Sequence, residues 1–82
     1  MAQADSINVD HVLDLEGVRC PDFIEAVRNF IRTKCESGQV VYIQADEPSS
    51  ARDIDRLCTF LDHELVHQDM SNPVYTFVVR KG

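Results

Sequence analysis

Apolar positions along the chain change their spacing several times, and each spacing predicts one type of element. The stretch HVLDLEG at residues 11–17 alternates apolar and polar positions, which predicts a short strand. From Pro21 the apolar residues recur at helical spacing, and this predicts a helix that fades near Gly38, a residue that can end it. The face that this helix would bury consists of Phe23, Ile24, Val27, Phe30 and Ile31.

The same change of spacing occurs again further along. The run VVYIQA at residues 40–45 is rich in β-branched and aromatic side chains and predicts a buried strand. After a turn, Ser49 or Ser50 is expected to begin a second helix, and Ser50 with Asp53 resembles a capping box. The apolar stripe of this helix is Ile54, Leu57, Cys58 and Leu61.

Two more strands follow, ELVHQ at residues 64–68 and VYTFVVR at residues 74–80, separated by the turn MSNP. The order β-α-β-α-β-β predicts an α/β (α+β) fold. We expect a two-layer sandwich in which two helices cover one face of a mixed four-stranded sheet. With 82 residues and no linker, a single domain over residues 1–82 is expected, with residues 1–10 as a flexible N-terminal segment.

Charge and composition narrow the choice of partners. The net charge of −6 disfavours nucleic acid as a direct partner, because neutralising phosphates requires clustered Lys and Arg. No apolar run approaches the length needed to span a bilayer, so a membrane is not expected either. The polar, acidic start of the sequence does not resemble a secretory signal, which favours the cytoplasm.

The residues that suggest disulfide or metal chemistry do not form recognisable motifs. The chain has three cysteines and no CxxC, so neither a disulfide framework nor a zinc site is expected. Cys58 falls on a core stripe and Cys35 at the end of the first helix, where packing is the better interpretation. His63 and His67 are expected to straddle a helix end and a strand start, which excludes a helical metal pair.

The third cysteine, Cys20, lies where the first strand gives way to a helix. If Pro21 is the first helical residue, Cys20 is the N-cap, and its sulfur lies at the positive end of the helix dipole. Arg19 adds a positive charge that also favours the thiolate, whereas Asp22 and Glu25 oppose it. Position alone leaves two interpretations open, a reactive thiol and a small residue that fills a helix start.

Four arginines form two i,i+4 pairs on the outward faces of the predicted helices. Such pairs could make a basic patch on an acidic protein, but an ordinary solvated face is the preferred interpretation. The pairs are Arg28 with Arg32 and Arg52 with Arg56.

Several separated segments resemble one family, the TusA/SirA-like sulfur carriers. The resemblance lies in LDLEGVRCPDF, ADEPSSARDIDRLCTFLDHELV and YTFVVRKG, and it includes the signature Gly17-x-x-Cys20-Pro21. It implies a β-α-β-α-β-β sandwich in which Cys20 accepts a sulfane sulfur as a persulfide, with Arg19 and Pro21 beside it. The donor would be a cysteine desulfurase and the recipient a downstream acceptor protein, one use being the formation of 2-thiouridine in tRNA.

The resemblance also implies a carrier without metal or organic cofactor, which is covalently loaded and is not a stand-alone enzyme. We expect a monomer. One position departs from the family motif, because Phe23 stands where the second proline of Cys-Pro-x-Pro is expected. We predict that the N–H of Phe23 points at the sulfur of Cys20 and that its ring lies beside the thiol. The departure also supports an alternative, a diverged binding or regulatory module that has lost the sulfur relay.

Overall fold

The structure is a computed structural model that describes residues 9–19, 21–71 and 74–82. Its six elements follow the predicted order β-α-β-α-β-β. They are β1 (His11–Leu15), α1 (Asp22–Lys34), β2 (Val40–Ala45), α2 (Ser50–Leu61), β3 (Glu64–Asp69) and β4 (Tyr75–Arg80). Residues 1–8, most of the segment expected to be flexible, lie outside the described residues, whereas Asp10 already exchanges hydrogen bonds with Val40.

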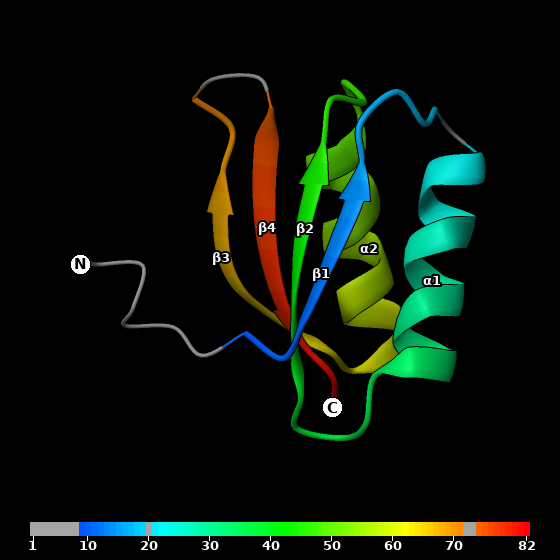
Figure 1. Ribbon diagram of the computed structural model, residues 1–82, viewed down its shortest axis with the longest axis vertical. Coiled ribbons are helices and arrows are strands. Elements are labelled where there is room, and N and C mark those ends of the chain that lie inside the picture. Colours follow the sequence, from blue (N-terminus) through cyan, green and yellow to red (C-terminus); the bar gives the residue numbers. More distant parts are fainter. Residues whose placement is uncertain (1–8, 20, 72–73) are drawn as a thin grey trace.

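The four strands form one mixed sheet in the order β1-β2-β4-β3. β1 pairs with β2 in parallel, and β4 pairs antiparallel with both β2 and β3. Both helices lie on the same side of this sheet (Figure 1). The predicted α+β two-layer sandwich is therefore confirmed.

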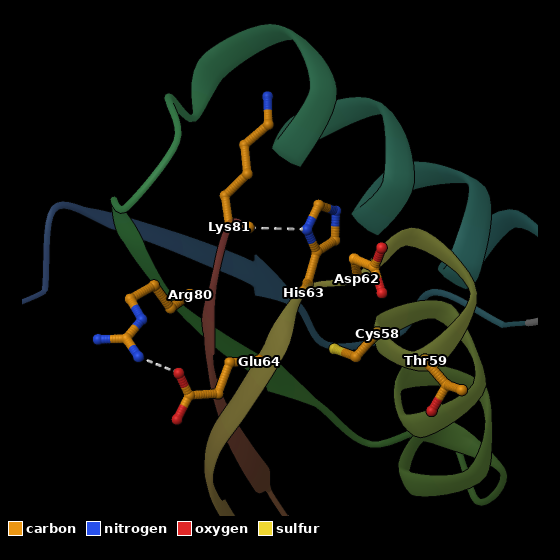
Figure 2. A pocket seen from close by; sticks show the side chains of 8 residues that line it. Cys58, Thr59, Asp62, His63, Glu64, Arg80 and Lys81 are labelled. Carbon is orange, nitrogen blue, oxygen red and sulfur yellow. Dashed lines mark hydrogen bonds and ion pairs between the residues drawn. The ribbon is translucent and has the colours of Figure 1, made fainter.

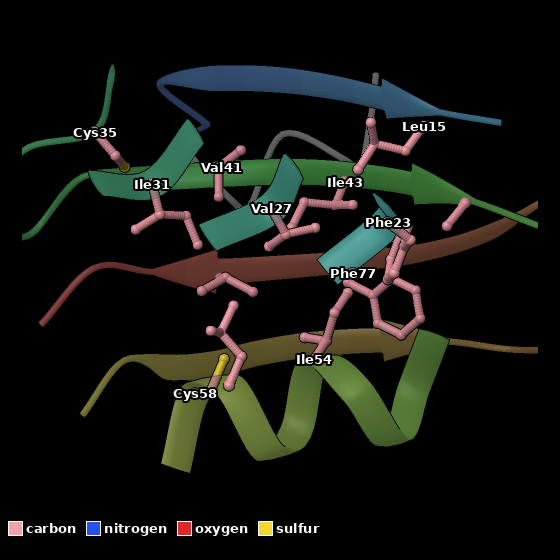
Figure 3. Packing of buried hydrophobic residues seen from close by; sticks show 13 residues of the cluster. Leu15, Phe23, Val27, Ile31, Cys35, Val41, Ile43, Ile54, Cys58 and Phe77 are labelled. Atoms are coloured by element: carbon pink, nitrogen blue, oxygen red, sulfur yellow. The ribbon is translucent and has the colours of Figure 1, made fainter. Parts of the chain in front are cut away.

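The hydrophobic core fills the space between the sheet and the helices (Figure 3). Alternation in the central strands directs one set of side chains to the helices, as in the cross-strand pair Ile43 and Phe77, both of which are fully buried. Helical spacing brings a matching stripe from each helix. The buried residues of the helices are Phe23, Val27 and Ile31 in α1, and Ser50, Ile54, Leu57 and Cys58 in α2.

The C-terminal end of α1 is closed by the side chain of Lys81, the residue that follows β4. The Nζ atom of Lys81 donates to the carbonyl oxygens of Ile31 at 3.1 Å and Cys35 at 2.8 Å. Cations near the last turn stabilise a helix because its final carbonyls lack partners. Gly38, which we predicted to end the helix, lies later, in the turn before β2, where it has a φ of +87°.

Candidate functional site

The candidate site lies at the sheet edge where the two parallel strands end. Leu15 and Ala45 are the last paired residues of β1 and β2, so the loops that follow them begin side by side. One loop leads into α1 and carries Cys20, and the other leads into α2 (Figure 1). Residues far apart in the sequence are thereby brought together at this edge.

Cys20 itself lies outside the described residues, but both of its neighbours are defined. Arg19 and Pro21 are exposed, and Pro21 has a φ of −86°, which suits a helix start. α1 begins at Asp22 with Pro21 as its N-cap, one residue later than we predicted, and no side-chain bond caps it. The assignment of Cys20 as the N-cap is therefore wrong.

The prediction for the N–H of Phe23 is also wrong. Its N–H donates to the carbonyl oxygen of Arg19 at 2.9 Å, the ordinary helical partner four residues back, and is not reserved for Cys20. Its ring is fully buried in the core, where it packs between the helix and the sheet (Figure 3), and its expected place beside the thiol of Cys20 lies outside the described residues. Phe23 thus serves the fold at a position where the family motif has a proline.

Asp46, the first residue after β2, connects the two loops. A single oxygen, Oδ1, accepts the N–H of Gly17 at 2.9 Å and the Nη1 of Arg19 at 2.7 Å. The bond from Arg19, followed by that from Gly17, lowers the pKa of Asp46, and the same bond raises the pKa of Arg19. The positive charge that we assigned to the thiol is therefore shared with a carboxylate.

Glu47 adds a second carboxylate, and unlike Asp46 it is buried. One of its oxygens accepts the N–H of Ser49 at 3.0 Å and the Ser49 hydroxyl at 2.8 Å, and the other lies 4.0 Å from the Nε of Arg19. Ser49 is the N-cap of α2, as one of our two alternatives proposed, but its side chain makes no backbone cap. Its hydroxyl lies 3.1 Å from a carboxylate oxygen of Asp53. The predicted capping box of Ser50 with Asp53 is wrong, because Ser50 lies inside the helix and the N–H of Asp53 donates to the carbonyl of Ser49.

Sequence reasoning missed Asp46 and Glu47. A signal for them exists, because the carboxyl ends of adjacent parallel strands meet at one edge of a sheet. The polar residues directly after β2 could therefore have been expected near the loop that follows β1.

The other two cysteines are buried, as predicted. Cys35 is 3% exposed and Cys58 is 4% exposed. Burial raises the pKa of both thiols, and for Cys58, with a further contribution from Asp55, the pKa is about 11. Neither thiol is available to a protein partner as a nucleophile.

A pocket at the opposite end of the molecule contains one of the histidines (Figure 2). His63 lies between α2 and β3, and His67 lies within β3, so they share no helix, as expected. The backbone N–H of Gly82 donates to Nδ1 of His63 at 3.1 Å. Within residues 9–19, 21–71 and 74–82, no group of three or more His, Cys, Asp or Glu could hold a metal ion.

The paired arginines of both helices are exposed, and Arg28 and Arg52 each form an ion pair with a carboxylate of their own helix. Arg28 forms an ion pair with Glu25 at 3.2 Å, and Arg32 donates to the side chain of Asn29 at 3.1 Å. These contacts stay within a single helix in each case and agree with a solvated face.

The sequence matches the family described as sulfurtransferase TusA over residues 11–81. The match includes every strand and both helices, as well as the loop that carries Cys20. The chain belongs to this family, whose members serve as sulfur carriers. In the part of the chain that the structure describes, no helix is long and apolar enough to cross a membrane.

Proposed function

We propose that this protein carries sulfane sulfur as a persulfide on Cys20, with Arg19 and Pro21 as the residues that flank the reacting thiol. The observation that carries the proposal is the family match over residues 11–81, which includes the Cys-Pro pair at the start of α1. The state of the other cysteines supports it, because both are buried among apolar side chains. Cys20 has two exposed neighbours instead.

The chemistry needs no oxidant and no cofactor. The Cys20 thiolate attacks the outer sulfur of a persulfide on a donor protein. A new S–S bond forms on Cys20 while the S–S bond of the donor breaks, and the donor cysteine leaves as a thiolate. The same exchange with an acceptor thiolate returns Cys20 to its free form.

The proposed donor is a cysteine desulfurase, or a protein that similarly presents a persulfide, and the proposed recipient is a downstream acceptor protein. One use of such sulfur is the formation of 2-thiouridine in tRNA. We place the relay in the cytoplasm, where a reducing environment keeps thiols free for exchange. The protein itself contacts other proteins in this scheme, with no direct role for RNA.

Mass spectrometry of the intact protein after incubation with a cysteine desulfurase and cysteine tests the proposal. We expect one added sulfur on the natural protein and none on Cys20→Ser. Cys58→Ser serves as the matched control. It should still load, although placing a hydroxyl in the core should lower the free energy of unfolding by about 1–3 kcal/mol. Sulfur that persists on the Cys20→Ser protein would overturn the assignment.

The alternative is a binding or regulatory module that keeps the fold without the relay. Phe23 was its main support, but the ring of Phe23 is buried in the core and is not part of a partner surface. The same loading experiment decides between the sulfur carrier and this alternative, because a module without the relay should take up no sulfur on any cysteine.

A further inference from the structure

The loop that carries Cys20 is tied to the sheet by a residue from another strand. Asp46 accepts two hydrogen bonds on one oxygen, from the backbone of Gly17 and from the side chain of Arg19. Arg19 is held a second time, because its carbonyl accepts the N–H of Phe23 at the start of α1. The residue directly before Cys20 is therefore fixed through both its side chain and its backbone.

Gly17 is held in a conformation that few other residues adopt. Its φ is +86°, a value that strains any residue with a Cβ, so the chain turns sharply here on leaving β1. The bond to Asp46 at 2.9 Å fixes the N–H of this turn. The direction in which the loop leaves the sheet, and so the position of the following residues, depends on that anchor.

We propose that Asp46 is the positioning residue of the carrier site, holding the Gly17–Pro21 loop so that Cys20 is presented to the persulfide of a donor protein. This inference rests on the proposed role of Cys20. Asp46 acts through Gly17 and Arg19 and takes no part in the exchange of sulfur. Transfer between two proteins depends on the geometry of the thiol, because misplacing a reacting group by a small distance slows a reaction strongly.

Two substitutions separate the position of the loop from the charge of Asp46. Asp46→Asn removes the charge but keeps an oxygen that can accept the N–H of Gly17, whereas Asp46→Ala removes both. Asp14→Ala is the matched control. Asp14 is a carboxylate of β1 that accepts only the nearby N–H of Glu16 in the described contacts and does not bind the loop further on.

The measurement is the rate of sulfur transfer from a loaded cysteine desulfurase in a single turnover. We expect Asp46→Ala to be slower by about five- to tenfold, the effect of losing hydrogen bonds of ordinary strength, and Asp46→Asn to stay within about twofold. Asp14→Ala should match the natural protein. Equal slowing in the two Asp46 variants, or no slowing in either, would overturn the proposal.

Alkylation of Cys20 by iodoacetamide across a range of pH adds a readout that needs no docked partner. Both Asp46 variants remove the negative charge that is paired with Arg19, the residue before Cys20, and this favours the thiolate, so their alkylation profiles should move to lower pH. The limiting rate at high pH should stay unchanged, because a small reagent reaches the thiol in any loop position. If the limiting rate of alkylation falls together with the rate of sulfur transfer, the substitutions have made the thiol of Cys20 itself less reactive. That result would overturn the positioning role of Asp46.

Hydrogen exchange at the amide of Gly17 distinguishes this inference from the proposed function. The amide should be protected in the natural protein and in Asp46→Asn, and should exchange rapidly in Asp46→Ala. If the natural protein accepts no sulfur, the proposed function fails while this exchange still reports whether Asp46 holds the loop. Equal exchange in all three proteins would overturn the role of Asp46.

Discussion

Burial decides what each cysteine can do at the scale of single residues. Cys58 faces the core and needs a pH near its pKa of about 11 to form a substantial fraction of thiolate. Cys35 is equally enclosed at the end of α1. The helical spacing of the sequence was sufficient to place these two residues. The role of Cys20 stays a prediction, because chemistry at a loop depends on contacts that spacing does not encode.

Ser50 shows a local conflict between packing and hydrogen bonding. Its side chain is fully buried, and its hydroxyl has no hydrogen-bond partner in the described part of the chain. A buried polar group without a partner carries a desolvation cost that folding does not recover. Ser50→Ala should therefore raise the free energy of unfolding by about 1 kcal/mol, measured by urea denaturation. A decrease would mean that the hydroxyl has a bound water or another partner.

At the scale of elements, the start of α1 shows where sequence reasoning reaches its limit. Proline suits both the N-cap and the first helical position, so Pro21 alone could not fix the first residue of the helix. The bond from the N–H of Glu25 to the carbonyl of Pro21, the N-cap, shows where the hydrogen bonds of the helix begin. The expected apolar stripe was correct at Phe23, Val27 and Ile31, because it depends on spacing and not on the exact first residue.

The buried position of Phe23 leads to a prediction about the family's proline. Phe23→Pro removes a fully buried ring and the N–H that Arg19 accepts. We expect the free energy of unfolding to fall by about 3–5 kcal/mol, as for other large core truncations. Urea denaturation measures this loss.

Phe60 provides the matched control for this substitution. It lies on α2 with 85% of its surface exposed, so Phe60→Ala should change stability by less than about 0.5 kcal/mol. Phe23→Leu keeps the N–H and most of the apolar volume, so its loss of stability should lie between those of Phe23→Pro and Phe60→Ala. A Phe23→Pro protein as stable as the natural one would contradict the core position of the ring.

At the scale of the whole molecule, the order of helices and strands could be predicted because the spacing of apolar residues differs between helices and strands. The order of strands in the sheet could not, since β4 inserts between β2 and β3 through pairings that no local pattern specifies. For the same reason, the contact between Asp46 and Arg19, which are separated by 27 positions in the chain, could not be predicted from the sequence. Contacts of this kind follow only after the parallel pairing of β1 with β2 is known.

At the end of the molecule away from the candidate site, His63 connects the segment between α2 and β3 to Gly82. Its Nδ1 accepts the N–H of Gly82, so the bound form is the neutral imidazole with its proton on Nε2. Burial, followed by the charge of Lys81, lowers the pKa of His63 below its ordinary value of 6.5. Protonation therefore costs more in the folded protein than in the unfolded chain.

The sign of this shift predicts how stability depends on pH. Between the folded pKa and 6.5 the unfolded chain binds more protons, so the free energy of unfolding should fall as the pH drops through 6.5. His63→Gln removes this contribution and should flatten the fall between about pH 7.5 and 5.5. Urea denaturation at several pH values measures it, with His67→Gln, an exposed histidine of β3, as the control. His63 is the histidine whose neutral form accepts the N–H of Gly82. A slope unchanged by His63→Gln would therefore show that other groups cause the acid sensitivity.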